Sequence, residues 1–144
     1  MPDLESGTGA VSTSGHSGGR ALILVVEKDE EIRELERYFL EGAGFAVEFA
    51  EDGDSALEKA LSLEPDVVVT EILVPKRDGL SLCRALKAKE SGTPPAVLVF
   101  SFLAAEDRAR DAGADAFLMK PLARRALIDV VETLLRLKRE QSDG

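Results

Sequence analysis

Short apolar runs separated by amphipathic stretches are the clearest pattern in this sequence. Residues 67–69 are three consecutive valines, and a β-branched run without polar alternation is typical of a strand covered on both faces. Comparable runs lie at 21–26, 96–100 and 116–120, while 45–50 alternates enough to predict a further strand. The pattern therefore predicts five strands, with 67–69 in the centre of the sheet.

The stretches between these runs predict helices. Apolar residues recur at helical spacing after the first run, and Asp29 is placed to cap that helix. These apolar residues are Ile32, Leu35, Phe39, Leu40 and Ala43. Further helices are predicted at 55–63, at 80–90 with Asp78 as the cap, as a short segment ending at Gly113, and at 123–139. Strands that alternate with helices require right-handed crossovers, so we expect an α/β, flavodoxin-like, doubly wound five-stranded parallel sheet in the order 2-1-3-4-5 with five helices.

The composition divides the chain into one domain and two tails. Residues 1–19 are dominated by Gly, Ser and Thr, with little to bury, and predict a disordered tail. His16 is the only histidine and lies in this tail without a partner, so no catalytic or metal role is expected for it. The folded domain is predicted over 20–139, followed by a short C-terminal tail at 140–144.

Charge and composition restrict the partners. The chain has 144 residues and a formal charge of -9, which would repel phosphate backbones, so nucleic acid is not an expected partner. No apolar run is long enough to span a bilayer and no signal peptide is visible, which favours a cytoplasmic protein with protein partners and no membrane contact. Cys83, the single cysteine, is expected to be a buried core residue.

The carboxyl ends of four predicted strands should meet at one edge of the sheet, where ligands of open α/β sheets usually bind. The residues expected at this edge are Glu27, Lys28, Glu71, either Phe100 or Ser101, and Lys120. From the residues alone, Glu71 could also be a plain strand-end carboxylate that accepts a hydrogen bond.

Three sequence blocks together resemble a known family. They are LILVVEKDE, PDVVVTEILVPKRDGLSLCRALK and AGADAFLMKPL, in this order and spacing. With them, the chain from Ala21 to about Arg139 resembles the receiver domain of response regulators, the phosphorylation-controlled module of bacterial two-component signalling.

The resemblance implies a defined site chemistry. In the family, two acids after the first strand hold magnesium, an aspartate after the third strand takes the phosphoryl group, and a Thr or Ser and a Lys contact the phosphoryl oxygens. Lys120, which precedes Pro121, matches the family lysine. Glu27 and Lys28 fall where the acidic pair belongs, and Glu71 replaces the aspartate.

These replacements change the charge of the site. Glu27 and Glu71 carry two negative charges and Lys28 and Lys120 two positive ones, so we expect a buried ion-pair cluster around Glu71 and no bound metal or other cofactor. In the alternative interpretation, Lys28 faces solvent and Asp29 serves as the second acid. Mg²⁺ would then be held by Glu27, Asp29 and Glu71.

The fourth strand and the segment after it also depart from the family pattern. The usual spacing from Pro95 puts Phe100 at the hydroxyl position, whereas one extra residue puts Ser101 there, which we prefer. The following segment is short, which predicts a short or displaced fourth helix. Phe117 matches the family's switch aromatic, although an aromatic on a buried strand is often simply core.

The resemblance supports two functions. The first is a non-enzymatic pseudo-receiver, not phosphorylated, that binds signalling proteins through the face of the fourth helix, fifth strand and fifth helix. The alternative is a working receiver that takes phosphate from a histidine kinase with Mg²⁺. In the first case Glu71 either imitates the activated state or marks a decayed site. The partner, the pathway and the oligomeric state stay open.

Overall fold

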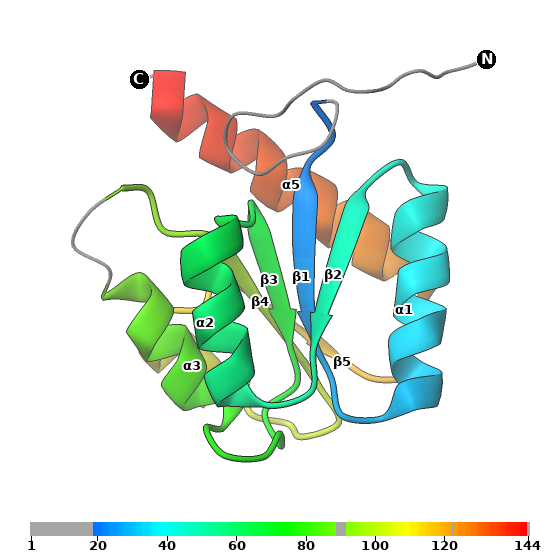
Figure 1. Ribbon diagram of the computed structural model, residues 1–144, viewed down its shortest axis with the longest axis vertical. Helices are drawn as coiled ribbons and strands as arrows, with labels where there is room; N and C mark the ends of the chain where they lie inside the picture. Colours follow the sequence, from blue (N-terminus) through cyan, green and yellow to red (C-terminus); the bar gives the residue numbers. More distant parts are fainter. Residues whose placement is uncertain (1–18, 89–91, 122, 144) are drawn as a thin grey trace.

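Five parallel strands form a single sheet in the order β2-β1-β3-β4-β5 (Figure 1), which confirms the predicted topology. The computed structural model describes residues 19–88, 92–121 and 123–143, so His16 and all but the last residue of the predicted N-terminal tail lie outside it. The strands are β1 (Leu22–Val26), β2 (Ala46–Ala50), β3 (Val67–Thr70), β4 (Ala96–Ser101) and β5 (Ala116–Met119).

Helices alternate with the strands. They are α1 (Glu30–Gly42), α2 (Gly53–Leu63), α3 (Gly79–Lys87), α4 (Glu106–Asp111) and α5 (Arg124–Asp143). Helix α4 has only 6 residues, as the short connecting segment predicted. Helix α5 continues to Asp143, beyond the predicted helix end near Arg139, because nothing in the sequence from 140 to 143 breaks a helix.

Both faces of the sheet are covered. Val68 packs into a core built with α2, α3 and α4, whereas Val67 and Val69 face a second core built with α1 and α5. Figure 1 shows α2 and α3 in front of the sheet and α5 behind it. Cys83 of α3 is fully buried in the first core, and this burial raises the pKa of its thiol to about 11. The uninterrupted valine run of β3 follows from burial on both sides.

Aspartates start three helices beside the carboxyl edge of the sheet. Asp29 accepts hydrogen bonds from the backbone N–H groups of Glu31 and Ile32 at 2.9 and 3.1 Å. Asp52 and Asp78 cap α2 and α3 in the same way. Because each cap satisfies N–H groups that the helix leaves free, these three loops are fixed next to the strand ends.

The loop between β3 and α3 folds tightly on itself and needs glycine. The N–H of Gly79 donates to the carbonyl of Ile72 at 2.8 Å, and a Cβ at Gly79 would lie 2.2 Å from the carbonyl oxygen of Glu71. A Cβ at Gly53 would lie 1.8 Å from the carbonyl oxygen of Arg77. Both close approaches hold the segment that follows Glu71 in place.

We expect Gly79→Ala to lower the free energy of unfolding by about 1–3 kcal/mol, because the added methyl group must displace backbone atoms. Gly42→Ala is the control: Gly42 ends α1 and has no atom within 4 Å of an added Cβ. That variant should be neutral or more stable by up to about 1 kcal/mol. Urea denaturation of both variants measures the difference, and equal effects would contradict the steric argument.

Candidate functional site

Lys120 is the centre of a buried polar cluster at the carboxyl edge of the sheet. Its ammonium group contacts Oε1 of Glu27 and lies 3.2 Å from Oε1 of Glu71. The side chains of Lys120, Glu27 and Glu71 are only 2%, 5% and 8% exposed. Ser101 completes this group, which we call the Lys120 cluster: Glu27, Glu71, Ser101 and Lys120.

Glu27 has partners for both carboxylate oxygens. Oε1 accepts from Lys120, and Oε2 accepts from the backbone N–H of Asp29 at 3.0 Å. The residue directly follows β1, and its own N–H donates to the carbonyl of Ala50 at 3.0 Å, which extends the pairing of β1 with β2. The position of this carboxylate is therefore set by the sheet on one side and by the start of α1 on the other.

Both oxygens of Glu71 are also engaged. Oε2 contacts the hydroxyl of Ser101 and accepts from the N–H of Ile72 at 2.7 Å, while Oε1 faces Lys120. The N–H of Glu71 donates to the carbonyl of Val26 at 3.1 Å, so this residue continues the pairing of β3 with β1. The side chain thus links the ends of three strands, β3, β4 and β5.

The structure places Ser101, and not Phe100, in the cluster. Strand β4 runs one residue farther than predicted and ends on Ser101, whose Oγ also accepts from the N–H of Leu103 at 3.1 Å. Phe100 points to the opposite side, into the core built with α1 and α5. Successive side chains along a strand point to opposite faces of the sheet. Ser101 and Phe100 therefore cannot both face the Lys120 cluster.

Lys28 does not join the cluster, and the expectation that it pairs with Glu71 was wrong. Its side chain is exposed, and among the described residues no ion pair connects it to Glu71. Glu27 faces inward as the chain leaves β1, so its neighbour faces outward. Asp29, the alternative second acid, is exposed as well and uses Oδ1 to cap α1.

The cluster contains two carboxylates for one ammonium group. Burial alone favours the neutral amine and would lower the pKa of Lys120. The hydrogen bond and the charge of Glu27, together with the charges of Glu36 and Glu71, outweigh this effect and raise the pKa of Lys120 above its ordinary value. Lys120 therefore stays positively charged throughout the physiological pH range.

Sequence reasoning missed Glu36, which is 2% exposed on the inner side of α1. Burial is the main cause that raises the pKa of its carboxyl to about 8, with Lys120 acting in the opposite direction and Glu27 and Glu71 adding to the rise. Its spacing was the available signal, because Glu36 lies four residues after Ile32 and four before Leu40. Leu35, which was expected on the buried face, is exposed.

Phe117 is half-buried on β5 and packs against the core on the α3 and α4 side. It lines a surface hollow together with residues of α4 and the loop before it. These are Ala104, Ala105, Glu106, Asp107 and Arg108, and Met119 of β5 also lines the hollow. Met119 and Phe102 nearby are 47% and 57% exposed, and Nζ of Lys120 lies 5.3 Å from the ring centroid of Phe102. An apolar surface thus adjoins the Lys120 cluster.

The residues present do not fit a magnesium ion. Every oxygen of Glu27 and Glu71 already has a donor from the protein, and Lys28 supplies no carboxylate where the family resemblance places an acid. In the part of the chain that the structure describes, no group of three or more His, Cys, Asp or Glu residues is arranged to hold a metal ion. A divalent ion at this edge would have to displace the ammonium group of Lys120.

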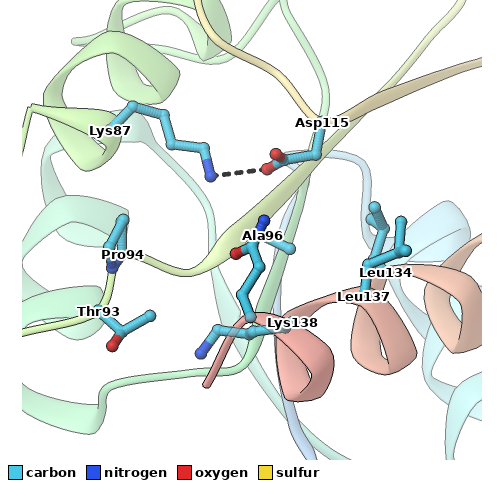
Figure 2. Close-up of a pocket in the computed structure, with 9 residues that line it drawn as sticks. Lys87, Thr93, Pro94, Ala96, Asp115, Leu134, Leu137 and Lys138 are labelled. Atoms are coloured by element: carbon cyan, nitrogen blue, oxygen red, sulfur yellow. Dashed lines mark ion pairs between the residues drawn. The ribbon is translucent and has the colours of Figure 1, made fainter. Parts of the chain in front are cut away.

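A second pocket lies at the other end of the sheet, between α3 and α5. It is lined by Lys87, Thr93, Pro94, Ala96, Asp115, Leu134, Leu137, Lys138 and Gln141 (Figure 2). Lys87 and Asp115 point toward each other with a distance of 2.7 Å between Nζ and Oδ2. Lys87 also donates to the carbonyl of Pro95, and Asp115 accepts from the N–H of Val97. These charges hold the start of β4 in place and are not free for a ligand.

Comparison with known proteins decides the family. Residues 23–132 match the model of the response regulator receiver domain. This chain belongs to that family. A response regulator MprA of Mycobacterium avium is 38% identical over 123 residues, which are 85% of this chain and 54% of that protein. The MprA of Mycolicibacterium vanbaalenii is 41% identical over 115 residues, 79% of this chain and 50% of that protein. The receiver domain thus spans about half the length of these curated relatives.

Solved structures agree with this assignment. A response regulator from Chloroflexus aurantiacus has a TM-score of 0.77 at 27% identity, with 81% of this chain and 98% of that chain covered. The chemotaxis protein CheY4 of Vibrio cholerae has a TM-score of 0.75 at 25% identity, with 81% and 100% covered. The protein is thus a receiver domain of two-component signalling.

Receiver domains are generally not enzymes, typically bind Mg²⁺ for phosphorylation, and interact with signalling proteins such as kinases. None of the described helices is both long and apolar enough to cross a membrane.

We expect Lys120→Met to lower the free energy of unfolding by about 3–5 kcal/mol, because it leaves two buried carboxylates without their counter-ion. Lys28→Met removes the same charge from an exposed position and should change stability by less than about 0.5 kcal/mol. Urea denaturation at pH 7 measures both. Similar losses of stability in the two variants would contradict the conclusion that Lys120 alone supplies the positive charge of the site.

Proposed function

We propose that this receiver domain does not take up phosphate and instead serves as a pseudo-receiver, a protein interaction module with a fixed surface. The observation that carries the proposal is the pair of contacts made by Glu71. Its carboxylate contacts the hydroxyl of Ser101 and faces the ammonium group of Lys120. The family resemblance assigns a hydroxyl and a lysine at these positions to the phosphoryl oxygens, so Glu71 takes the contacts that phosphate would make.

The geometry also disfavours phosphoryl transfer to Glu71. A carboxylate that attacks phosphorus needs a free oxygen in line with the leaving group. It also needs a metal ion or another cation to neutralise the transferred group. Oε1 of Glu71 is paired with Lys120, and Oε2 accepts from Ser101 and from Ile72. Attack would require the loss of contacts that hold a buried charge, which raises the barrier.

Constitutive imitation of the activated state fits these contacts better than decay. A drifted side chain in a site without function needs no partner on each oxygen, and would more readily turn toward solvent. Glu71 instead connects β3, β4 and the residue after β5. A carboxylate has less charge and fewer acceptor oxygens than phosphate. Here the Glu71 carboxylate nevertheless contacts both Ser101 and Lys120 without any modification.

The proposed partner surface is the face of α4, β5 and α5. Phe102 and Met119 are exposed large apolar residues beside the half-buried Phe117, and such groups are enriched at protein interfaces. The contact between Ser101 and Glu71 fixes the end of β4. The neighbouring surface is therefore held in one arrangement and is not switched by phosphorylation. The proposed partner is a signalling protein, and the interaction does not depend on phosphorylation.

Incubation with acetyl phosphate and Mg²⁺, followed by intact-mass measurement, tests the proposal. The wild-type protein should show no phosphoryl adduct, while an ordinary receiver domain treated in parallel shows that the donor is active. The double variant Lys28→Asp with Glu71→Asp restores the acids that the family resemblance places at these positions, and it should gain an adduct. The gain would show that these two residues account for the lost reaction.

A wild-type adduct that disappears in Glu71→Gln would restore the alternative, a phosphotransfer receiver that uses Glu71 as its acceptor. Absence of an adduct from both the wild type and the rebuilt double variant would mean that the block lies elsewhere in the site. Glu34→Gln, on the exposed side of α1, serves as the matched carboxylate control and should behave as the wild type does.

A further inference from the structure

Glu36 is a buried carboxyl group that the proposed function does not use. It lies on α1 at 2% exposure, and its Oε1 has no hydrogen-bond partner among the described residues. An ionised carboxylate in such a place would lose its hydration without receiving a donor at Oε1 in return, and the neutral acid avoids most of this cost. The geometry around this one side chain therefore favours the protonated form.

The charged groups near Glu36 act in both directions: Lys120 favours the ionised form, whereas Glu27 and Glu71 favour the neutral acid. Those that act on it are Lys120, Glu27 and Glu71, which approach from the ends of β5, β1 and β3. The single positive charge of Lys120 is already shared by the other two carboxylates. An ionised Glu36 would make three buried carboxylates around one ammonium group.

Other cations do not compensate Glu36. On its own helix, Arg33 donates to the carbonyl of Glu27 at 3.0 Å, and Arg37 pairs with Glu34 and Glu41. On the elements packed against α1, the charged side chains are exposed to solvent. These are Glu48 of β2 and Arg124, Arg125, Asp129, Glu132, Arg136, Arg139 and Glu140 of α5, whereas Lys138 is half-buried near the far end of α5 and lines the pocket of Figure 2.

We propose that Glu36 is a buried proton-binding site: the domain folds around its neutral acid, and release of this proton weakens the fold and loosens the Lys120 cluster. An ionised Glu36 would compete with Glu27 and Glu71 for the ammonium group of Lys120, and so for the contact that positions Glu71. This inference does not depend on whether Glu71 can be phosphorylated.

The direction of the pH effect follows from linkage. Glu36 has a pKa of about 8 in the folded protein against 4.5 for an ordinary glutamate carboxyl, so the folded state binds one more proton than the unfolded state between these values. Stability is then greatest at or below pH 4.5 as far as this group is concerned, and falls as the pH rises toward 8. Above pH 8 the contribution of Glu36 to stability is constant, because the folded and the unfolded state have both lost the proton.

Chemical denaturation between pH 5 and pH 9 of the wild type, Glu36→Gln and Glu34→Gln tests the proposal. One bound proton makes the unfolding equilibrium constant rise by up to about tenfold per pH unit in the window below pH 8. Glutamine has the shape of the neutral acid but cannot titrate, so Glu36→Gln should lose this slope. Glu34→Gln changes an exposed carboxylate two residues away and should keep it.

Each variant loses one glutamate and retains every other titrating group, so the comparison separates the buried Glu36 from the exposed Glu34. Cys83, whose pKa is about 11, does not titrate in this window. A slope that persists unchanged in Glu36→Gln, or a wild-type stability that is flat from pH 5 to pH 8, would overturn the proposal.

A second measurement needs no variant to fold. Carbon NMR of wild-type protein labelled at the glutamate carboxyl carbon should show one resonance that titrates near pH 8, well above the ordinary glutamate range of about 4 to 5. Signals that all titrate below pH 6 would show that Glu36 is ionised in the folded protein and would rule the proposal out.

Discussion

The arrangement of this receiver domain at its functional edge depends on one buried ammonium group. Lys120 connects the residue after β5 to Glu27 after β1 and to Glu71 after β3. A lysine at this depth stays charged only because carboxylates accompany it, and the carboxylates stay buried only because the lysine does. Lys120, Glu27 and Glu71 each follow a different strand. The attraction between their charges therefore holds the loops of the site together. Gly79 and the helix caps then place the backbone donors that satisfy the remaining oxygens.

This arrangement explains how a receiver domain can keep part of the family's site without its acceptor aspartate. The lysine and the hydroxyl are present, and Glu71 makes contacts with both that the family resemblance assigns to phosphate. Two carboxylates and one ammonium leave a net negative charge in the cluster. Burial is the main reason that Glu36 favours the neutral acid; the negative charges of Glu27 and Glu71 add to this preference, and the charge of Lys120 opposes it. The proposed interaction surface and the proposed proton site are thus linked through the same lysine.

Hydrophobic pattern sufficed to predict the strand order and the helices, because burial on both faces of the sheet requires continuous apolar strands and amphipathic helices between them. The residues at the carboxyl edge were partly accessible to the same reasoning. Lys120, Glu27 and Glu71 follow buried strands directly, but Lys28 is turned outward by the first step of the chain away from β1. Glu36 was missed because a charged residue is assigned by default to the solvent face. Its raised pKa comes from burial and from charges on distant parts of the chain, which periodicity does not report.

The central claim is that Glu71 makes the contacts with Ser101 and Lys120 that phosphate would make, and that Lys120 is its counter-ion in place of a metal ion. Its most direct test is a high-resolution crystal structure of the protein grown in excess Mg²⁺ together with beryllofluoride, a phosphoryl analogue. The account predicts that the ammonium group of Lys120 lies between Glu27 and Glu71, with Ser101 on the second oxygen of Glu71 and no ion bound to these carboxylates. A magnesium ion held by Glu27 and Glu71, with the analogue bound to Glu71 and contacted by Ser101 and Lys120, would contradict the account.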